Sequence, residues 1–511
     1  MTPPSSTYRL QIRRTFTLDD AAATVGYLQD LGVGAVYLSP ILQSTTGSDH
    51  GYDTTDPLRI DTDRGGEDGW AALLGAAAEA GLQVVVDIVP NHLGIAVPRE
   101  NPYWWDVLKH GQASAYAGWF DIDWSRPITL PVLGDDAVVS VEDGELTYYE
   151  HHFPLAPGSW SPGDDPEAVH ERQHYRLVHH ARGDRELSYR RFFTVTTLAG
   201  VRQEDPAVFE ATHQRVATMI TEGVTGLRVD HPDGLVDPGE YQERLARLAP
   251  GAWITVEKIL EPGERLPDWP VAGTTGYDAM REVNGVFVDT AGEAEATERY
   301  QRLTGDQLTS AEQVEQGKRM IVDRLLVAEV ERIAALAPEV EGGSAAIAEV
   351  AVAFGVYRSY LPDGTADLDK ALVLAEQRRP ELASAFAELS PRLHDASDEL
   401  ARRFQQLSGA TMAKGTEDTA FYRYARFIAL NEVGADAGEF GIGLEDFHAL
   451  QHVRQERQPL SMTSLSTHDT KRGEDVRARL AVLAEVGPEW ERFAEHFLQR
   501  SGIPNRAFAY F

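Results

Sequence analysis

Two carboxylates each stand at the end of a short apolar run in this 511-residue sequence. Asp230 follows GLRV and Glu257 follows WITV, and runs of this kind, rich in β-branched residues, are typical of buried parallel strands. The residues between them predict one helix, so the segment is a strand–helix–strand unit with a carboxylate after each strand. In a barrel of such units the carboxyl ends of the strands form the rim where chemistry takes place.

Polar side chains end two further predicted strands. The run QVVVDIVPNH carries Asp87, Asn91 and His92 near its end, and a run over residues 459–469 ends at His468 and Asp469. A single buried aspartate is more often a satisfied structural group than a reactive one. Because four separate strand ends carry such groups, we expect them to converge on one pocket.

Converging carboxylates suit the cleavage of a glycosidic bond. One carboxylate must stay ionised as the nucleophile while another holds a proton for the leaving oxygen, and burial together with neighbouring like charge arranges this. Arg228 lies two residues before Asp230 on the same strand face, so we expect it to keep Asp230 ionised and oriented, and His231 comes next in the chain. No Gly-rich phosphate loop precedes a helix, which argues against a nucleotide-dependent enzyme.

Strands and helices alternate on both sides of this unit. Apolar runs in TYRLQI, GVGAVYLSPIL and GLQVVVDIVPNHLG predict three strands, and amphipathic patterns predict helices over 17–31, 70–80 and 205–222. The alternation predicts an α/β fold, a (β/α)8 TIM-type barrel. Turn-rich sequence with five tryptophans predicts a β-rich insertion, subdomain B, after strand 3, and Ala-, Glu- and Leu-rich sequence predicts a helical insertion after strand 6. The expected parts are barrel residues 1–93, 201–291 and 459–511, the β-rich insertion 94–200 and the helical insertion 292–458.

Composition excludes several classes of protein and site. A formal charge of −33 argues against nucleic acid and anionic membranes as partners. The absence of cysteine excludes disulfides, thiolate metal sites and cysteine nucleophiles. The N-terminus lacks a signal-peptide pattern and no apolar run is long enough to span a bilayer, so we expect a cytoplasmic protein. No acidic loop has the spacing of a calcium motif, and we expect neither a metal nor a cofactor.

Several motifs resemble those of one known enzyme superfamily. HGYDTTDP, DIVPNH, GLRVDHPDG, VEKIL and STHD occur in this order and resemble the conserved regions of the α-amylase superfamily, glycoside hydrolase family 13. A more specific resemblance is to the maltooligosyltrehalose synthases of this superfamily, and it is carried by the motifs TYRLQ, SYRRFF, GTTGYD, KGTEDTAFYR and THDTKRGED. The resemblance implies an intramolecular transglucosylase that turns the reducing-end α-1,4 bond of a maltooligosaccharide, or of a starch- or glycogen-derived α-1,4-glucan, into an α,α-1,1 bond. It also implies a pathway partner, maltooligosyltrehalose trehalohydrolase.

The same resemblance implies a role for each matched residue. Asp230 matches the nucleophile, Glu257 the general acid/base, and Asp469 the third acid, which stabilises the oxocarbenium-like state. The remaining matches are expected to bind or support the glucose ring, with Tyr52 as its stacking platform, Asp87 and Asn91 as supporting residues, and His92, Arg228, His231 and His468 as contacts.

Two basic residues in the subfamily motifs carry a further hypothesis. Lys414, at an expected helix start within 412–424, and Arg472, just beyond Asp469, are expected to hold the reducing-end glucose. Surface salt bridges are the alternative for both. Replacing either residue should then raise the ratio of free glucose to trehalose-type product.

Family members continue beyond the point that matches Phe511, so the resemblance predicts a barrel truncated before strand 8 and lacking a C-terminal β-domain. An open barrel leaves exposed strand edges, and an inactive truncated member is therefore one alternative. Another α-glucan hydrolase or transglucosylase of the superfamily is a second. A catalytically silent glycan-binding or scaffold protein is the third, although retention of all three acids argues against it.

Overall fold

The structure, a computed structural model, describes residues 3–511 and divides into two compact units. The first unit contains the chain up to Val256 together with Trp269–Val271 and Leu325–Glu329. The second contains Glu257–Asp268, Ala272–Arg324 and Val330–Phe511. Asp230 therefore belongs to the first unit, and Glu257 and Asp469 belong to the second.

A parallel sheet forms the centre of the first unit. Its neighbouring strands, all parallel, are β1 (Thr7–Leu10), β2 (Ala35–Leu38), β5 (Gln83–Ile88), β14 (Gly226–Val229) and β15 (Trp253–Val256), in that order. The last two strands are buried along their whole length, as the apolar runs predict. The sheet is a half-barrel of the TIM type, and its register places Arg228 between Asp87 and Thr255 on the neighbouring strands.

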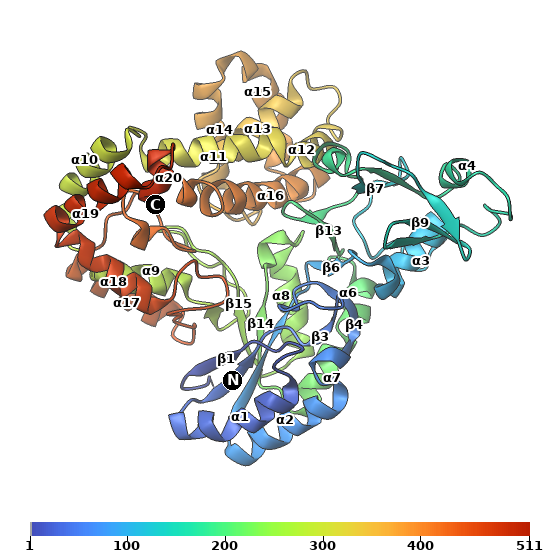
Figure 1. Cartoon of the computed structure of the whole chain (residues 1–511), viewed down its shortest axis with the longest axis horizontal. Coiled ribbons are helices and arrows are strands. Elements are labelled where there is room, and N and C mark those ends of the chain that lie inside the picture. The colour runs from blue at the N-terminus through green and yellow to red at the C-terminus, as the bar shows by residue number, and fades with distance from the viewer. Residues whose placement is uncertain (1–2) are drawn as a thin grey trace. The chain divides into compact units, whose positions relative to one another are not determined.

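Helices connect these strands as the sequence predicts. They are α1 (Leu18–Leu31), α2 (Gly66–Ala80), α6 (Pro206–Thr212), α7 (Gln214–Glu222) and α8 (Pro238–Leu248). α1 begins with a capping box in which Thr17 and Asp20 bond to each other's backbone N–H groups, and it packs beside α2 (Figure 1). The prediction of one continuous helix over 205–222 is wrong, because the segment forms two helices, α6 and α7, that are separated at His213.

His213, at this break, is buried and neutral. Burial lowers its pKa to about 4, and its Nδ1 and Nε2 contact the Phe209 carbonyl at 3.0 Å and the Tyr241 hydroxyl at 2.8 Å. An unfolded histidine binds a proton near pH 6.5 and the folded one does not. The free energy of unfolding should therefore fall by about 3 kcal/mol as the pH is lowered from 6.5 towards 4.

Urea unfolding at a series of pH values tests this expectation. His213→Asn should flatten the acid limb of the stability curve by about that amount. His452→Asn is the matched control, since the His452 side chain is 76% exposed. Equal acid slopes for the parent and His213→Asn would contradict the expectation.

The insertion between β5 and β14 is β-rich, as predicted. Strands β8 (Ser140–Glu142), β9 (Glu145–Tyr148) and β10 (His151–Pro154) form an antiparallel sheet, and β7 (Ile128–Leu133) pairs with β11 (Tyr175–His179). β13 (Val195–Gly200) pairs with β12 (Arg191–Phe192) and with β6 (His92–Gly94), which follows β5. The other elements are β3 (Leu42–Ser44) and β4 (Thr54–Ile60), which precede β5, and helices α3 (Pro102–His110), α4 (Pro166–His170) and α5 (Gly183–Glu186). Trp104 and Trp119 are buried in the core of this insertion rather than displayed on its surface.

After β15 the chain is almost entirely helical. A two-residue strand, β16 (Gly273–Thr274), lies within the GTTGYD motif. The helices are α9 (Tyr277–Val286), α10 (Glu293–Thr304), α11 (Ser310–Arg324), α12 (Val327–Ala334), α13 (Gly343–Ala353), α14 (Thr365–Arg378), α15 (Ala383–Leu393), α16 (Glu399–Met412), α17 (Leu444–Arg457), α18 (Glu474–Ala481), α19 (Gly487–Arg500) and α20 (Arg506–Tyr510). α11, α13, α14, α15 and α16 pack together into a helical cluster (Figure 1). No helix within residues 3–511 is long and apolar enough to cross a membrane.

Two expectations about the C-terminal half are wrong. Residues 459–469 do not form a strand, because this segment makes only isolated contacts, such as Met462 N–H to the Thr274 carbonyl at 3.1 Å. The segment 412–424 is not a helix start. α16 ends there in a π-helical turn, Ala413–Glu417, so Lys414 lies at the C-terminal end of a helix.

Candidate active site

Arg228 joins two carboxylates in the interior of the first unit. Its Nη1 donates to Asp87 Oδ1 at 2.9 Å and to Asp230 Oδ1 at 2.6 Å, and its side chain is fully buried. The contact between Arg228 and Asp230, expected from their spacing on one strand, is confirmed. A buried guanidinium beside a carboxylate stabilises its ionised form, which is the form a nucleophile requires.

Two tyrosine hydroxyls complete the shell around Asp87. Tyr52 Oη donates to Asp87 Oδ2 at 2.5 Å, and Tyr37 Oη donates to the same oxygen at 3.2 Å. Burial raises the pKa of Tyr52 well above its usual value, so the phenol keeps its proton. Burial also raises the pKa of Asp87, against the opposing charge of Arg228. We call Tyr37, Tyr52, Asp87, Arg228 and Asp230 the Asp230 cluster.

His92 is fixed as a neutral imidazole beside this cluster. Burial lowers its pKa to about 4, so Nε2 carries the proton and donates to the Tyr52 carbonyl at 2.9 Å. Nδ1 then accepts from Asn91 Nδ2 at 3.3 Å, and Asn91 Oδ1 accepts from Arg190 at 2.6 Å. This chain gives His92 one tautomer and one orientation.

Two phenylalanines of the SYRRFF motif surround the histidines. The Phe192 ring lies 4.6 Å from the His92 ring and 5.0 Å from that of His231, and Phe193 lies 4.6 Å from His231. Phe193 and His231 both have positive φ, 48° and 43°, which is strained for a side chain of this size. The sequence analysis identified the SYRRFF motif. It did not predict the packing of the two phenylalanines against the histidines or the positive φ angles of Phe193 and His231.

Glu257 directly follows β15 and begins the second unit. Within that unit, its charge acts on Tyr357, whose pKa is raised well above its usual value by burial first and then by Glu417, Glu261 and Glu257. Tyr357 Oη donates to Glu417 Oε1. Burial raises the pKa of Glu417 to about 7, with Lys471 opposing the shift and Asp469 adding to it.

Asp469 is held from three sides in the second unit. Tyr277 Oη donates to Asp469 Oδ2 at 3.1 Å, His468 Nε2 lies 3.1 Å from the same oxygen, and the Asp469 N–H donates to Thr467 Oγ1 at 3.1 Å. We call Glu257, Tyr277, Tyr357, Glu417 and Asp469 the Glu257 cluster. It contains three carboxylates. The charges of Glu257 and Glu417 act on Tyr357, and the charge of Asp469 acts on Glu417. Clusters of this kind shift the pKa values of their members apart.

Comparison with known proteins identifies the family. The α-amylase catalytic-domain model matches residues 17–244. The solved structure of maltooligosyltrehalose synthase from Arthrobacter ramosus is 50% identical, with a TM-score of 0.97 over 99% of this chain and 68% of that one. The chain belongs to the maltooligosyltrehalose synthase family.

Other maltooligosyltrehalose synthases agree with this placement. A protein named putative maltooligosyl trehalose synthase from Mycobacterium tuberculosis is 45% identical over 97% of the chain. A Sulfolobus tokodaii structure titled hypothetical maltooligosyl trehalose synthase is 33% identical, with a TM-score of 0.86 over 100% of this chain and 69% of that one. The chain spans 66% of the length of the Mycobacterium relative.

The two basic residues expected at the acceptor glucose both have protein partners. Lys414 Nζ donates to Asp418 Oδ2 at 2.6 Å, and its side chain is 23% exposed. Arg472 donates to the Asn431 carbonyl at 3.2 Å, and its guanidinium lies 5.3 Å from the Phe511 ring centre. Their roles at an acceptor glucose stay predictions.

Sequence reasoning missed three residues of the second unit. Glu417 and Lys471 lie inside KGTEDTAFYR and THDTKRGED, so their motifs were the available signal. Lys258 follows Glu257, is buried, pairs with Glu264 at 2.8 Å and lies 5.2 Å from the Tyr357 ring centre. No signal in the sequence predicts that contact with Tyr357, which lies after the end of α13, about a hundred residues further along the chain.

Proposed function

We propose that this chain carries the catalytic residues of an intramolecular transglucosylase. The reaction converts the reducing-end α-1,4 bond of a maltooligosaccharide into an α,α-1,1 bond, giving maltooligosyltrehalose. The observation that supports it best is the buried Arg228, which donates to Asp230 directly after β14 in a chain of this family. That contact is what an ionised carboxylate nucleophile requires.

The proposed mechanism is a retaining double displacement. Asp230 attacks the anomeric carbon of the penultimate glucose while Glu257 donates a proton to the departing O4 of the terminal glucose. The released glucose stays bound and turns, and its anomeric hydroxyl then attacks the glycosyl ester as Glu257 takes up the proton. The ester bond to Asp230 breaks, so no water is consumed and the number of bonds is unchanged.

The remaining residues support this chemistry in the proposal. Asp469, held by Tyr277 and His468, stabilises the oxocarbenium-like state. Tyr52 stacks on the glucose ring while His92 and His231 contact its hydroxyls, and Asp87 and Asn91 hold Arg228 and His92 in place. We further infer that a maltooligosyltrehalose trehalohydrolase consumes the product.

Incubation with maltopentaose tests the proposal. The expected product is non-reducing at its former reducing end, so reducing-end equivalents should fall without a matching release of glucose. Accumulation of free glucose and shorter reducing sugars instead would favour a hydrolase of the same superfamily. Absence of any conversion would contradict the proposed activity for this chain.

Lys414 and Arg472 give a prediction about product partition. If they hold the acceptor glucose, Lys414→Ala or Arg472→Ala should raise the ratio of glucose to trehalose-type product by about tenfold, since a loosely held acceptor leaves before it turns. Lys370→Ala is the matched control, because Lys370 pairs with Asp367 at 2.8 Å and its side chain is 76% exposed. An unchanged ratio would assign Lys414 and Arg472 to surface ion pairing and packing.

A further inference from the structure

The TYRLQ motif at the start of the chain directs two side chains towards the loop that carries Tyr52. Gln11 Nε2 donates to the Asp49 carbonyl at 2.9 Å and to the His50 carbonyl at 3.3 Å. Arg9, in β1, donates through Nη1 to Gln11 Oε1 at 2.9 Å and through Nη2 to Tyr52 Oη at 3.3 Å. The Gln11 amide has a donor partner on one side and an acceptor partner on the other, so its orientation is fixed.

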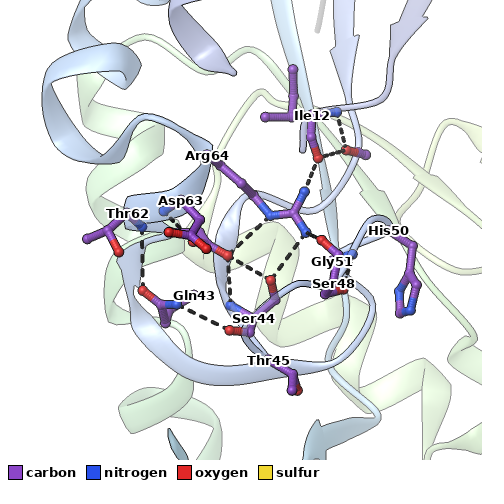
Figure 2. A network of polar contacts seen from close by, with 12 residues as sticks. Ile12, Gln43, Ser44, Thr45, Ser48, His50, Gly51, Thr62, Asp63 and Arg64 are labelled. Atoms are coloured by element: carbon purple, nitrogen blue, oxygen red, sulfur yellow. Dashed lines mark hydrogen bonds and ion pairs between the residues drawn. The ribbon is translucent and has the colours of Figure 1, made fainter. Parts of the chain in front are cut away.

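Arg64 also forms hydrogen bonds with this loop (Figure 2). This buried guanidinium donates to the Ser48 carbonyl at 2.8 Å, to Ser44 Oγ at 3.2 Å and to the Ile12 carbonyl. The Ile12 carbonyl belongs to the residue after Gln11, so Arg64 ties the loop to the end of the TYRLQI segment. Three backbone carbonyls of the loop are therefore held, those of Ser48, Asp49 and His50.

At the centre of the loop, the backbone conformation requires glycine at position 51. Gly51 has φ +85°, and a Cβ there would lie 2.6 Å from the Pro40 carbonyl oxygen. The Gly51 N–H donates to Ser48 Oγ at 3.1 Å, and that hydroxyl donates to Asp53 Oδ1 at 2.6 Å. Tyr52 leaves this turn with its side chain directed at Asp87.

A continuous chain of hydrogen bonds then connects β1 with the proposed nucleophile, and Asp87 is the acceptor in the middle of it. Because Arg9 occupies a lone pair of Tyr52 Oη, the phenol proton is directed to Asp87. Asp87 in turn accepts from Arg228, which also donates to Asp230. Arg9 also lies 5.7 Å from the Tyr37 ring centre, so the same guanidinium borders both tyrosines that donate to Asp87.

We propose that Arg9 and Gln11 are positioning residues that hold Tyr52 against Asp87 and fix the loop Ser48–Asp53 for sugar stacking. We call the contacts of Arg9 and Gln11 with this loop and with Tyr52 the clamp. The expected kinetic effect of the clamp rests on the proposed function, and the existence of the clamp does not depend on that function. Neither residue needs to touch substrate. Losses of about 10- to 100-fold are typical when a residue that orients a catalytic group is removed.

The test compares Gln11→Ala with Gln11→Glu, which keeps an acceptor for Arg9 but loses the donor to Asp49 and His50. Both variants should speed hydrogen exchange at the Gly51 and Tyr52 amides by about tenfold and lower kcat/KM on maltopentaose about tenfold. Arg9→Lys should lower kcat with little change in KM, because it redirects the Tyr52 hydroxyl and leaves the loop in place.

Gln29→Ala is the matched control. Gln29, in α1, likewise donates its side-chain amide to a backbone carbonyl, that of Ala80 in α2, at 2.9 Å. This substitution should change neither exchange at Gly51 and Tyr52 nor the kinetic constants. Unchanged exchange in Gln11→Ala, or faster exchange with parental kcat and KM, would overturn the proposal. If the parent itself converts no maltopentaose, the proposed function fails, and the exchange measurement alone decides whether the clamp exists.

Discussion

Asp230→Asn is expected to lower the rate of maltopentaose conversion by about 10⁴-fold or more. Asparagine keeps the shape and still accepts a hydrogen bond from Arg228, but its amide cannot form the glycosyl ester of a double displacement. The measurement is the initial rate of formation of non-reducing product, with enzyme concentration high enough to detect the residual rate. The melting temperature should stay close to that of the parent.

Asp237→Asn is the control for this prediction. Asp237 lies seven residues further on, and as the N-cap of α8 it accepts from the Glu240 N–H at 2.9 Å. Asparagine caps helices as well as aspartate does, so this variant should keep parental activity and stability. Parental turnover by Asp230→Asn would remove Asp230 from the chemistry and return the silent glycan-binding protein to consideration.

The limits of β14 and β15 were predictable because each is a short buried run with a clear end. They begin and end where GLRV and WITV do, because both strands are buried along their whole length and a carboxylate follows each of them directly. The segment 459–469 lacks such a run. Its hydroxyl groups form single side-chain contacts instead. Thr467 Oγ1 accepts from the Asp469 N–H at 3.1 Å, Ser461 Oγ donates to the Thr274 carbonyl at 3.1 Å, and no strand forms.

Contacts in the candidate site were likewise predictable where they join residues close together in the sequence, and not where they join distant ones. Arg228 and Asp230 are two residues apart on one strand, so their side chains share a face and their contact follows from the period of the strand. The contacts of Tyr357 with Glu417, and of Arg9 with Tyr52, join residues 60 and 43 positions apart. Such pairings depend on how helices and loops pack, and no local pattern encodes them.

Arg228→Met is expected to have the second-largest effect, on both stability and activity. It removes the cation that lies between two buried carboxylates, of which Asp87 is fully buried and the Asp230 side chain is 8% exposed. Breaking a buried ion pair from one side costs about 3–5 kcal/mol, because the remaining charge is left uncompensated. The pKa of Asp230 should rise without the guanidinium, so turnover at neutral pH should fall about 10³-fold and its acid limb should move to higher pH.

A second substitution separates the two effects. Asp87→Asn in the Arg228→Met background removes one of the uncompensated charges, so it should restore about half of the lost free energy of unfolding. It should not restore turnover, because Asp230 still lacks the donor that orients and ionises it. Urea unfolding and the pH–rate profile of the single and double variants provide the measurement. Recovery of activity together with stability would mean that Arg228 serves the fold alone, and that Asp230 is ionised and oriented without it.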